Sequence, residues 1–478
     1  MRVARNSAAA SASSICAANG NAGSDGDALS RGIAVGIAIA VAINLAVTGE
    51  YTVIAVIAAV MLHWIVLNDI HLNPYNPGPP AWRGADTNPA LFDSSVEAMR
   101  QRVPDASVIV IGGDLLAHHF AALARRAHQD PYAAGVNTAR QIATALDKAF
   151  PHAQFLIAVG NNDDPCGDYR SESGGAYNRA IAQVFAPLVN RRGASPAFID
   201  DFTRGAYYTA SLPNGMRAVV TNSVFWSFFF RGGCQANTRD PGGREMNWLA
   251  QTLGENKNVV VMHMPPGYDP ESTTDAYSIL PVPFLRAHFD SELRSLFEKD
   301  RANVPFSIAG HTHRYDFRVP GGVPMLVAAS LSPIYHNEPA FFRLDVDSGG
   351  LHDIVPFTND PDLGWIRQQS FNQMFGTDSF TQPQLDGLSN RITSDSDLRS
   401  RWIRAYDVWG YYVGDVTDNR WQTYRCAQVA FGDDYARCAG TYVKSVMNLL
   451  LAAAAVIVLV VMAALLFVIW RRATPSSQ

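Results

Sequence analysis

Between residues 64 and 355, short apolar runs alternate with longer mixed segments. The runs are rich in β-branched or strongly apolar residues, as buried strands are, and several end directly in Gly, Asp, Asn or His. We expect strands at residues 64–67, 107–111, 154–159, 218–222, 258–262, 305–308 and 325–329. Helix-like stretches lie between them at residues 94–102, 138–150, 244–253 and 290–299. This alternation predicts an α/β fold with helices packed on sheets, at residues 63–358.

The pattern changes after this central domain. Trp, Tyr, Arg and Asp become frequent in helix-like text, including residues 397–412, which predicts a small helical subdomain at residues 359–445. An uninterrupted apolar run then extends over residues 449–470 and is followed at once by Arg471 and Arg472. A run of about 20 apolar residues can cross a bilayer as a helix, and flanking arginines favour the cytoplasmic side. We therefore expect a transmembrane helix at residues 446–470 and a cytoplasmic tail at residues 471–478.

The first 62 residues are harder to interpret. Residues 1–31 are rich in Ala, Ser, Asn and Gly and predict a disordered or removed leader. Arginines precede an apolar run at residues 32–47, so we interpret residues 32–62 as a secretory signal or signal anchor. Two short membrane spans are the alternative, and they would place the central domain in the cytoplasm. The arginine pair at the other end opposes that alternative.

Charge and cysteine content narrow the choice of partners and compartment. The net charge of −5 argues against broad electrostatic binding to nucleic acid. One of the five cysteines lies in the leader, and four lie beyond it, at Cys166, Cys234, Cys426 and Cys438. In an exported chain these four can form two disulfides, whereas free buried thiols are the alternative. The predicted location of the central domain is outside the cytoplasm, at a cell surface, in a lysosomal or vacuolar lumen, or in a periplasm.

Five short polar motifs follow the predicted strands. They contain seven candidate metal ligands: Asp69 and His71, Asp114, Asn161, His263, and His311 and His313. Carboxylate oxygen, amide oxygen and imidazole nitrogen are ligands suited to zinc, iron or manganese. Residues two apart on an extended segment point the same way, so each Asp-X-His or His-X-His pair can converge on one site. The motifs together predict a centre of two metal ions.

In this order, the motifs resemble the calcineurin-like metallophosphoesterases, and more narrowly their acid sphingomyelinase-like branch. The likeness covers residues 64–357 and weakens through residue 442. Three passages carry the narrower likeness: residues 113–118, residues 162–169, and residues 331–341, which is similar to the family's Ser-Pro-Tyr-Asn-Pro-Phe segment. The resemblance implies a layered β-sandwich flanked by helices. It also implies hydrolysis of a phosphodiester or phosphoanhydride at a membrane surface.

By this resemblance the ligands divide between two divalent ions. Zinc is the expected metal, and manganese or iron are the alternatives. Asp114 would bridge the pair. Asp69, His71 and His313 would complete one site, and Asn161, His263 and His311 the other. A hydroxide held between the cations would attack phosphorus, and the leaving oxygen would then need a proton.

The chain departs from many relatives at the proton-transfer step. They carry His directly after the metal-binding Asn, whereas this chain carries Asn162, which can donate a hydrogen bond to phosphate but cannot deliver a proton at neutral pH. We therefore expect His118 to be the proton donor, as the equivalent His in the sphingomyelinase-like branch lies near the leaving oxygen. The motif Asn161-Asn162-Asp163 also resembles the corresponding motif of endopolyphosphatase-like members of the family.

The family resemblance further implies the disulfides Cys166–Cys234 and Cys426–Cys438. A sphingomyelinase-like phosphodiesterase is the expected function. The alternatives are an endopolyphosphatase or extracellular nucleotide phosphohydrolase, and a catalytically inactive surface binding protein on the same fold. The aromatic run at residues 225–230 is compatible either with contact to a lipid or hydrophobic leaving group or with simple burial.

Overall fold

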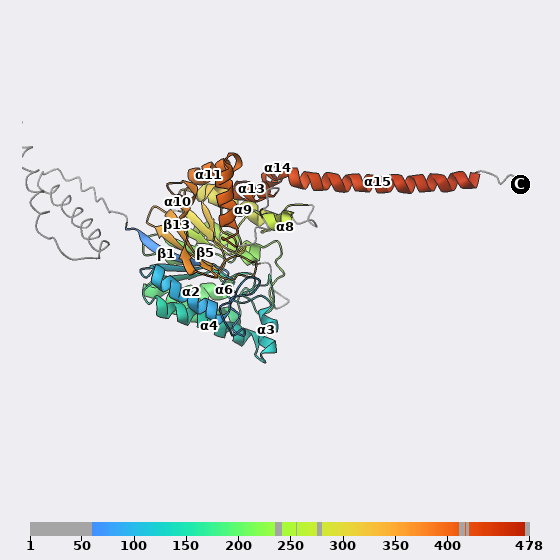
Figure 1. The fold of residues 1–478 in the computed structure, drawn as a ribbon. Helices are drawn as coiled ribbons and strands as arrows, with labels where there is room; N and C mark the ends of the chain where they lie inside the picture. The colour runs from blue at the N-terminus through green and yellow to red at the C-terminus, as the bar shows by residue number, and fades with distance from the viewer. Residues whose placement is uncertain are drawn as a thin grey trace, which may run out of the picture. The chain divides into compact units, whose positions relative to one another are not determined.

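The computed structural model describes residues 60–234, 241–254, 256–274, 280–410, 416 and 420–473 (Figure 1). The leader predicted at residues 1–31, most of the segment at residues 32–62 and most of the tail lie outside the described residues. The described part confirms the predicted α/β class, because two six-stranded mixed sheets carry helices around them.

The first sheet contains both antiparallel and parallel pairs. Its strands, in spatial order, are β14 (Gly364–Arg367), β13 (Leu351–Asp360), β12 (Ala340–Val346), β1 (Leu62–Leu67), β2 (Val108–Ile111) and β3 (Gln154–Ile157). β1, β2 and β3 run parallel, so their carboxyl ends meet at one edge. The sequence analysis missed β12, β13 and β14. β13 ends at Asp360 and β14 lies wholly after residue 358, so the sheet continues into the region that was predicted to be helical.

The second sheet has a similar plan. Its strands, in spatial order, are β10 (Asp316–Arg318), β11 (Met325–Val327), β9 (Phe306–Ala309), β6 (Asn258–Val261), β5 (Arg217–Val220) and β4 (Tyr208–Ser211). The pairs β5–β6, β6–β9 and β9–β11 are parallel. A short separate hairpin is formed by β7 (Tyr268–Asp269) and β8 (Val282–Pro283).

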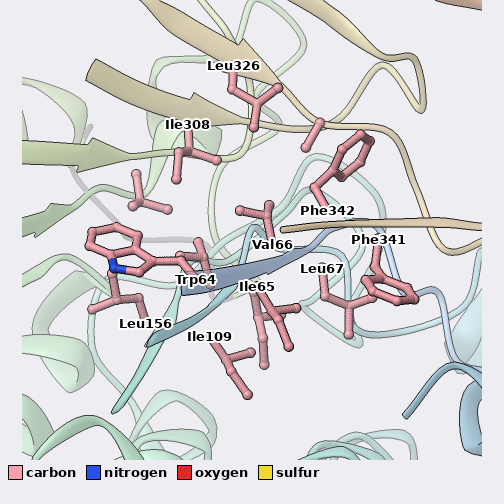
Figure 2. Packing of buried hydrophobic residues seen from close by; sticks show 14 of the residues in the cluster. Trp64, Ile65, Val66, Leu67, Ile109, Leu156, Ile308, Leu326, Phe341 and Phe342 are labelled. Carbon is pink, nitrogen blue, oxygen red and sulfur yellow. The ribbon is translucent and has the colours of Figure 1, made fainter. Parts of the chain in front are cut away.

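β1 packs on both of its faces. Its central residues are fully buried, and successive side chains of a strand point to opposite faces. In Figure 2, Val66 points toward Ile308 and Leu326 of the second sheet, whereas Ile65 and Leu67 point the other way. Burial on both faces explains why the strand is a continuous apolar run rather than an alternating one.

Helices cover the outer faces of the sheets. The helices of the central domain are α2 (Pro89–Arg102), α3 (Phe120–Arg126), α4 (Pro131–Ala149), α5 (Ala176–Val189), α6 (Phe198–Gly205), α7 (Gly242–Thr252), α8 (Pro270–Thr274) and α9 (Ala287–Asp300). Figure 1 shows α2, α4 and α6 at one face and α9, α11 and α13 at the other. Asn88 and Asp130 cap the first turns of α2 and α4 before a proline, so these helices begin earlier than the predicted starts at residues 94 and 138.

The region after β14 is helical, as predicted. It contains α10 (Phe371–Phe375), α11 (Gln382–Ser394), α12 (Ser396–Tyr406), α13 (Trp421–Val429) and α14 (Asp433–Cys438). The disulfide Cys426–Cys438 joins α13 to α14. α15 (Gly440–Ala473) follows, and within it Leu449–Ile469 has a mean hydropathy of 3.2 and no buried share. A helix of this length and composition is a candidate membrane span.

Candidate metal centre

The seven predicted metal ligands all follow the carboxyl ends of parallel strands. β1 leads to Asp69 and His71, β2 to Asp114, β3 to Asn161, β6 to His263, and β9 to His311 and His313. Because the two sheets pack face to face, loops from both meet at one edge. Ligand sites of open α/β sheets commonly form at such an edge.

One group of donors comes from both sheets. Asp69, His71 and His313 place their ligand atoms within 4.8 Å of one another. His313 Nε2 lies 3.5 Å from Asp69 Oδ1 and 3.2 Å from His71 Nε2. All three side chains are buried and are therefore shielded from bulk water.

A second group shares Asp69 and centres on Asp114. Asp69, Asp114 and His263 also have ligand atoms within 4.8 Å of one another. Asp114 Oδ2 lies 3.4 Å from His263 Nε2 and 3.4 Å from His71 Nε2, which is the position of a carboxylate shared between two sites. Asn161 Oδ1 lies 3.1 Å from His263 Nε2, and the His311 ring lies 5.1 Å from the His263 ring, centroid to centroid.

The hydrogen bonds of this cluster leave lone pairs pointing inward. His71 Nδ1 lies 3.0 Å from the Leu116 carbonyl and His263 Nδ1 lies 2.9 Å from the Gly112 carbonyl, so each Nδ1–H donates outward and each Nε2 faces the cluster. Asp69 Oδ1 is buried and accepts no hydrogen bond from the residues that the structure describes. Buried carboxylate, amide and imidazole atoms that face one another in this way are a donor set that fits divalent cations.

The electrostatics agree with a cation site. Burial and the nearby charge of Asp114 raise the pKa of Asp69 to about 7, although His263 opposes this. Burial lowers the pKa of His71 to about 4 and that of His313 well below its usual value, so both imidazoles are neutral. Burial also opposes ionisation of Asp114, but His263 and His71 hold the pKa of Asp114 well below its usual value. Neutral imidazoles beside carboxylates are the protonation states that bind metals.

Five of the seven predicted ligands have positive backbone φ angles. They are Asp69, His71, Asp114, His311 and His313, with φ between 45° and 71°. Such a conformation costs about 1–3 kcal/mol for a non-glycine residue and gathers at functional sites. Gly160 contributes differently, because a Cβ atom there would lie 2.1 Å from Asp114 Oδ1. The turn after β3 can approach Asp114 only because residue 160 has no side chain.

His118 lies at the edge of the cluster, partly exposed. Its ring stacks on the His71 ring with centroids 4.0 Å apart. Asp86 accepts hydrogen bonds from His118 Nδ1 at 2.8 Å and from its backbone amide at 2.9 Å. Burial opposes the imidazolium, but the hydrogen bond and charge of Asp86 raise the pKa of His118 above its usual value. The sequence analysis missed Asp86, which lies in a loop 32 residues before His118 and belongs to none of the strand-end motifs.

Asn162 and Asp163 brace the turns beneath the cluster. The Asn162 backbone amide and side-chain Nδ2 donate to the two oxygens of Asp114, at 2.8 and 3.0 Å. Asp163 accepts hydrogen bonds from the backbone amides of Asp114, Leu115 and Gly160, at 2.9, 2.6 and 2.7 Å. Sequence analysis assigned no role to Asp163, although it stands in the Asn-Asn-Asp motif, because a carboxylate that accepts backbone amides cannot be told by its spacing from one that faces a metal.

The Cys166–Cys234 disulfide pins the loop that follows this motif, and it pairs the cysteines as predicted. Cys166 lies three residues after Asp163, and Cys234 lies beyond the aromatic run at residues 225–230. The bond therefore joins two loops that leave opposite sheets near the metal ligands.

Comparison with known proteins gives consistent relatives. Residues 62–315 match the family described as Calcineurin-like phosphoesterase. Sphingomyelinase phosphodiesterase D of Dictyostelium discoideum is 22% identical over 365 residues, which cover 70% of this chain and 76% of the relative. Acid sphingomyelinase-like phosphodiesterase 3b of Mus musculus is 25% identical over 253 residues, which cover 51% of each chain. Cyclic GMP-AMP phosphodiesterase SMPDL3A of Homo sapiens is 24% identical over 277 residues, which cover 55% of this chain and 56% of the relative.

Proposed function

Because the chain belongs to the calcineurin-like phosphoesterase family, we propose that it is a membrane-anchored phosphodiesterase that uses two divalent metal ions. The observation that supports this most directly is the meeting of buried carboxylate, amide and imidazole donors from both sheets around the unpaired oxygen of Asp69. Burying a carboxylate oxygen without a hydrogen-bond donor costs free energy, which a bound cation would offset.

The donor set divides as the family resemblance implies. Asp69, His71 and His313 would hold one ion, and Asn161, His263 and His311 the other, with Asp114 shared. Two bound cations would polarise a phosphate ester and lower the pKa of a bound water, with zinc the expected metal and manganese or iron the alternatives. The protein contributes fixed ligand positions through Asn162 and Asp163.

His118 would donate a proton to the leaving oxygen. Asp86 engages Nδ1 and the backbone amide together, which fixes the ring and leaves Nε2 as the nitrogen that transfers the proton. Asn162 would position Asp114 through its side-chain amide. This division of roles accounts for a chain that lacks a histidine directly after Asn161.

We propose a lipid phosphodiester, with a sphingomyelin-like head group, as the substrate. Two relatives are named as sphingomyelinase or acid sphingomyelinase-like phosphodiesterases, and the candidate span Leu449–Ile469 would hold the site near lipid. A relative named as a cyclic GMP-AMP phosphodiesterase makes a nucleotide the comparison substrate for any assay.

The proposed topology places the catalytic domain outside the cytoplasm. Arg471 and Arg472 directly follow the apolar span, and cations of this kind favour the cytoplasmic side. Two disulfides on the other side of the span suit an oxidising compartment. Protease added to intact cells should digest the domain. Protection until the membrane is opened would contradict this topology.

The deciding experiment compares the full-length protein with Asp114→Asn and with Asp200→Asn, an exposed carboxylate in a weak ion pair 3.6 Å from Arg179. Hydrolysis of bis-p-nitrophenyl phosphate with added zinc or manganese should disappear in Asp114→Asn and persist in Asp200→Asn. Metal content per chain should fall only in Asp114→Asn. Equal rates in all three proteins would reject the metal-dependent mechanism. Sphingomyelin, cyclic GMP-AMP, ATP and polyphosphate then rank the substrates.

A further inference from the structure

The aromatic run at residues 225–230 is divided between core and surface. Phe225 and Trp226 are fully buried, whereas the side chains of Phe228 and Phe229 are 52% and 44% exposed. Hydrogen bonds fix the backbone where the run emerges, because the Phe228 amide donates to the Phe284 carbonyl at 2.9 Å and the Phe229 amide to Ser227 Oγ at 3.1 Å. The two rings are therefore held outward by an ordered turn.

These rings border the metal centre. The Phe229 ring lies 5.3 Å from the Tyr169 ring, and the Tyr169 ring lies 6.1 Å from the ring of the candidate ligand His311. Exposed Arg231 follows in the same turn, where its amide donates to the Tyr169 carbonyl at 2.9 Å. Exposed aromatic rings next to a cation are typical of protein surfaces that enter the lipid head-group region.

The same side of the domain is connected to the candidate span. The loop after His263 leads into β7, where Tyr268 stacks on Tyr435 of α14 with centroids 4.4 Å apart and an interplanar angle of 7°. α15 begins at Gly440, and the apolar span begins at Leu449. At about 1.5 Å of rise per residue, this helical segment is about 14 Å long. The loop that follows the candidate ligand His263 is therefore held close to the point where the chain would enter a bilayer.

We propose that Phe228 and Phe229 form a membrane-docking surface that inserts into the bilayer holding α15, so that the metal centre meets lipid phosphodiesters of that leaflet. This inference rests on the proposed membrane anchoring and phosphodiester hydrolysis. The two rings meet edge to face, at an interplanar angle of 82°, so they do not form the parallel clamp that would hold a flat nucleobase. Their geometry suits insertion among acyl chains.

Insertion can be measured without any catalysis. Phe228→Trp and Leu363→Trp are compared in the full-length protein reconstituted into phosphatidylcholine vesicles that contain dibrominated acyl chains. Leu363 is the matched control, because it is 73% exposed in the turn between β13 and β14. After subtraction of wild-type fluorescence, the tryptophan at position 228 should be quenched by the bromine atoms and the tryptophan at position 363 should not. Equal absence of quenching at both positions would overturn the proposal.

Activity provides a second measurement. Phe228→Ser should lower hydrolysis of a vesicle lipid by about tenfold, which is the equilibrium factor expected from burying one such ring. Hydrolysis of soluble bis-p-nitrophenyl phosphate should change by less than about twofold, and Leu363→Ser should change neither rate. An equal fall on both substrates would overturn docking and indicate that Phe228 contacts the substrate directly. If the protein hydrolyses neither substrate, the proposed function fails, and quenching at position 228 still decides the docking question.

Discussion

The sheet of β1, β2 and β3 supplies two carboxylates to the candidate metal centre, Asp69 and Asp114, whereas the candidate ligands from β6 and β9 are all imidazoles. The imidazoles from the second sheet differ among themselves. Asp114 and Asp69 raise the pKa of His263 to about 9 against the effect of burial, while burial lowers the pKa of His311 to about 3. Neither set of ligands is electrostatically complete alone, so the site forms only when the two sheets pack together.

This contrast explains how the charge is balanced. Two buried carboxylates facing each other repel, and a protonated His263 compensates for part of that charge. In the proposed metal centre, a divalent cation would supply this compensation, and His263 would bind it as a neutral imidazole, because ligands generally lose protons when metals bind. The carboxylate side should therefore control whether metal binds, and the imidazole side should adjust how tightly each ion is held.

The largest expected effect comes from removing a carboxylate. Asp69→Asn should lower kcat/KM by about 10³-fold, because several kcal/mol of transition-state stabilisation depend on bound metal. Metal analysis should show loss of metal from the purified protein. His311→Ala should retain more metal than Asp69→Asn, and added imidazole should restore part of its activity. Retention of activity within about tenfold in Asp69→Asn would show that the carboxylates do not dominate.

The close approach between the turn after β3 and Asp114, which follows β2, can be tested by one methyl group. Gly160→Ala should lower kcat/KM by about 10²-fold, because its Cβ would displace Asp114, and an error of about 1 Å in a reacting group costs this much. Gly243→Ala is the matched control, since nothing lies within 4 Å of its added Cβ and the position is helical. Equal activity of the two variants would contradict the need for a close approach.

The role of His118 predicts a dependence on the leaving group. His118→Ala should lower hydrolysis of alkyl phosphodiesters by about 10²-fold but that of nitrophenyl esters by less than about tenfold, because nitrophenolate leaves without protonation. His119→Ala changes the exposed neighbouring residue and should have little effect on either substrate. A uniform loss on both ester classes would exclude proton donation by His118.

How much of this could be predicted depended on the kind of pattern. Parallel strands such as β2 and β6 are continuous β-branched runs, and distinctive polar motifs follow their buried ends, so these strands were predictable and the seven candidate ligands could be proposed from the sequence. β13 carries Pro356 and polar residues at both ends, so it lacks the continuous apolar run that marks β2 and β6, although it pairs with the preceding strand β12 as a local hairpin. Asp86 and Asp163 were missed for a different reason, since each accepts hydrogen bonds from residues that are 32 to 49 positions away in the sequence.

A buried carboxyl group of β10, where this strand contacts the helical region, provides the contrasting case. Asp316 accepts hydrogen bonds from Gln428 Nε2 at 2.8 Å and Trp402 Nε1 at 3.3 Å, and therefore joins β10 to α13 and α12. Burial raises its pKa to about 6, although the hydrogen bond from Gln428 opposes the shift. Unlike Asp69, whose Oδ1 accepts no hydrogen bond from the described residues and whose Oδ2 accepts one from the His311 amide at 3.1 Å, this carboxyl group has two side-chain donors.

The smallest effect on activity, and a clear effect on stability, is therefore expected from Asp316→Asn. Between the unfolded pKa of Asp316, near 3.8, and its folded value of about 6, the folded protein binds more protons than the unfolded chain. The contribution of protonated Asp316 to the free energy of unfolding is therefore full below this interval and is lost as pH rises through it. Across the interval, the free energy of unfolding of wild type should fall relative to Asp316→Asn by up to about 3 kcal/mol. Chemical unfolding at several pH values tests this, with Asp93→Asn, an exposed carboxyl, as control. If the free energies of unfolding of wild type and Asp316→Asn depend on pH in the same way, Asp316 titrates alike in the folded and unfolded states. Loss of metal from Asp316→Asn would show that the contact between β10 and the helical region is coupled to the candidate metal centre.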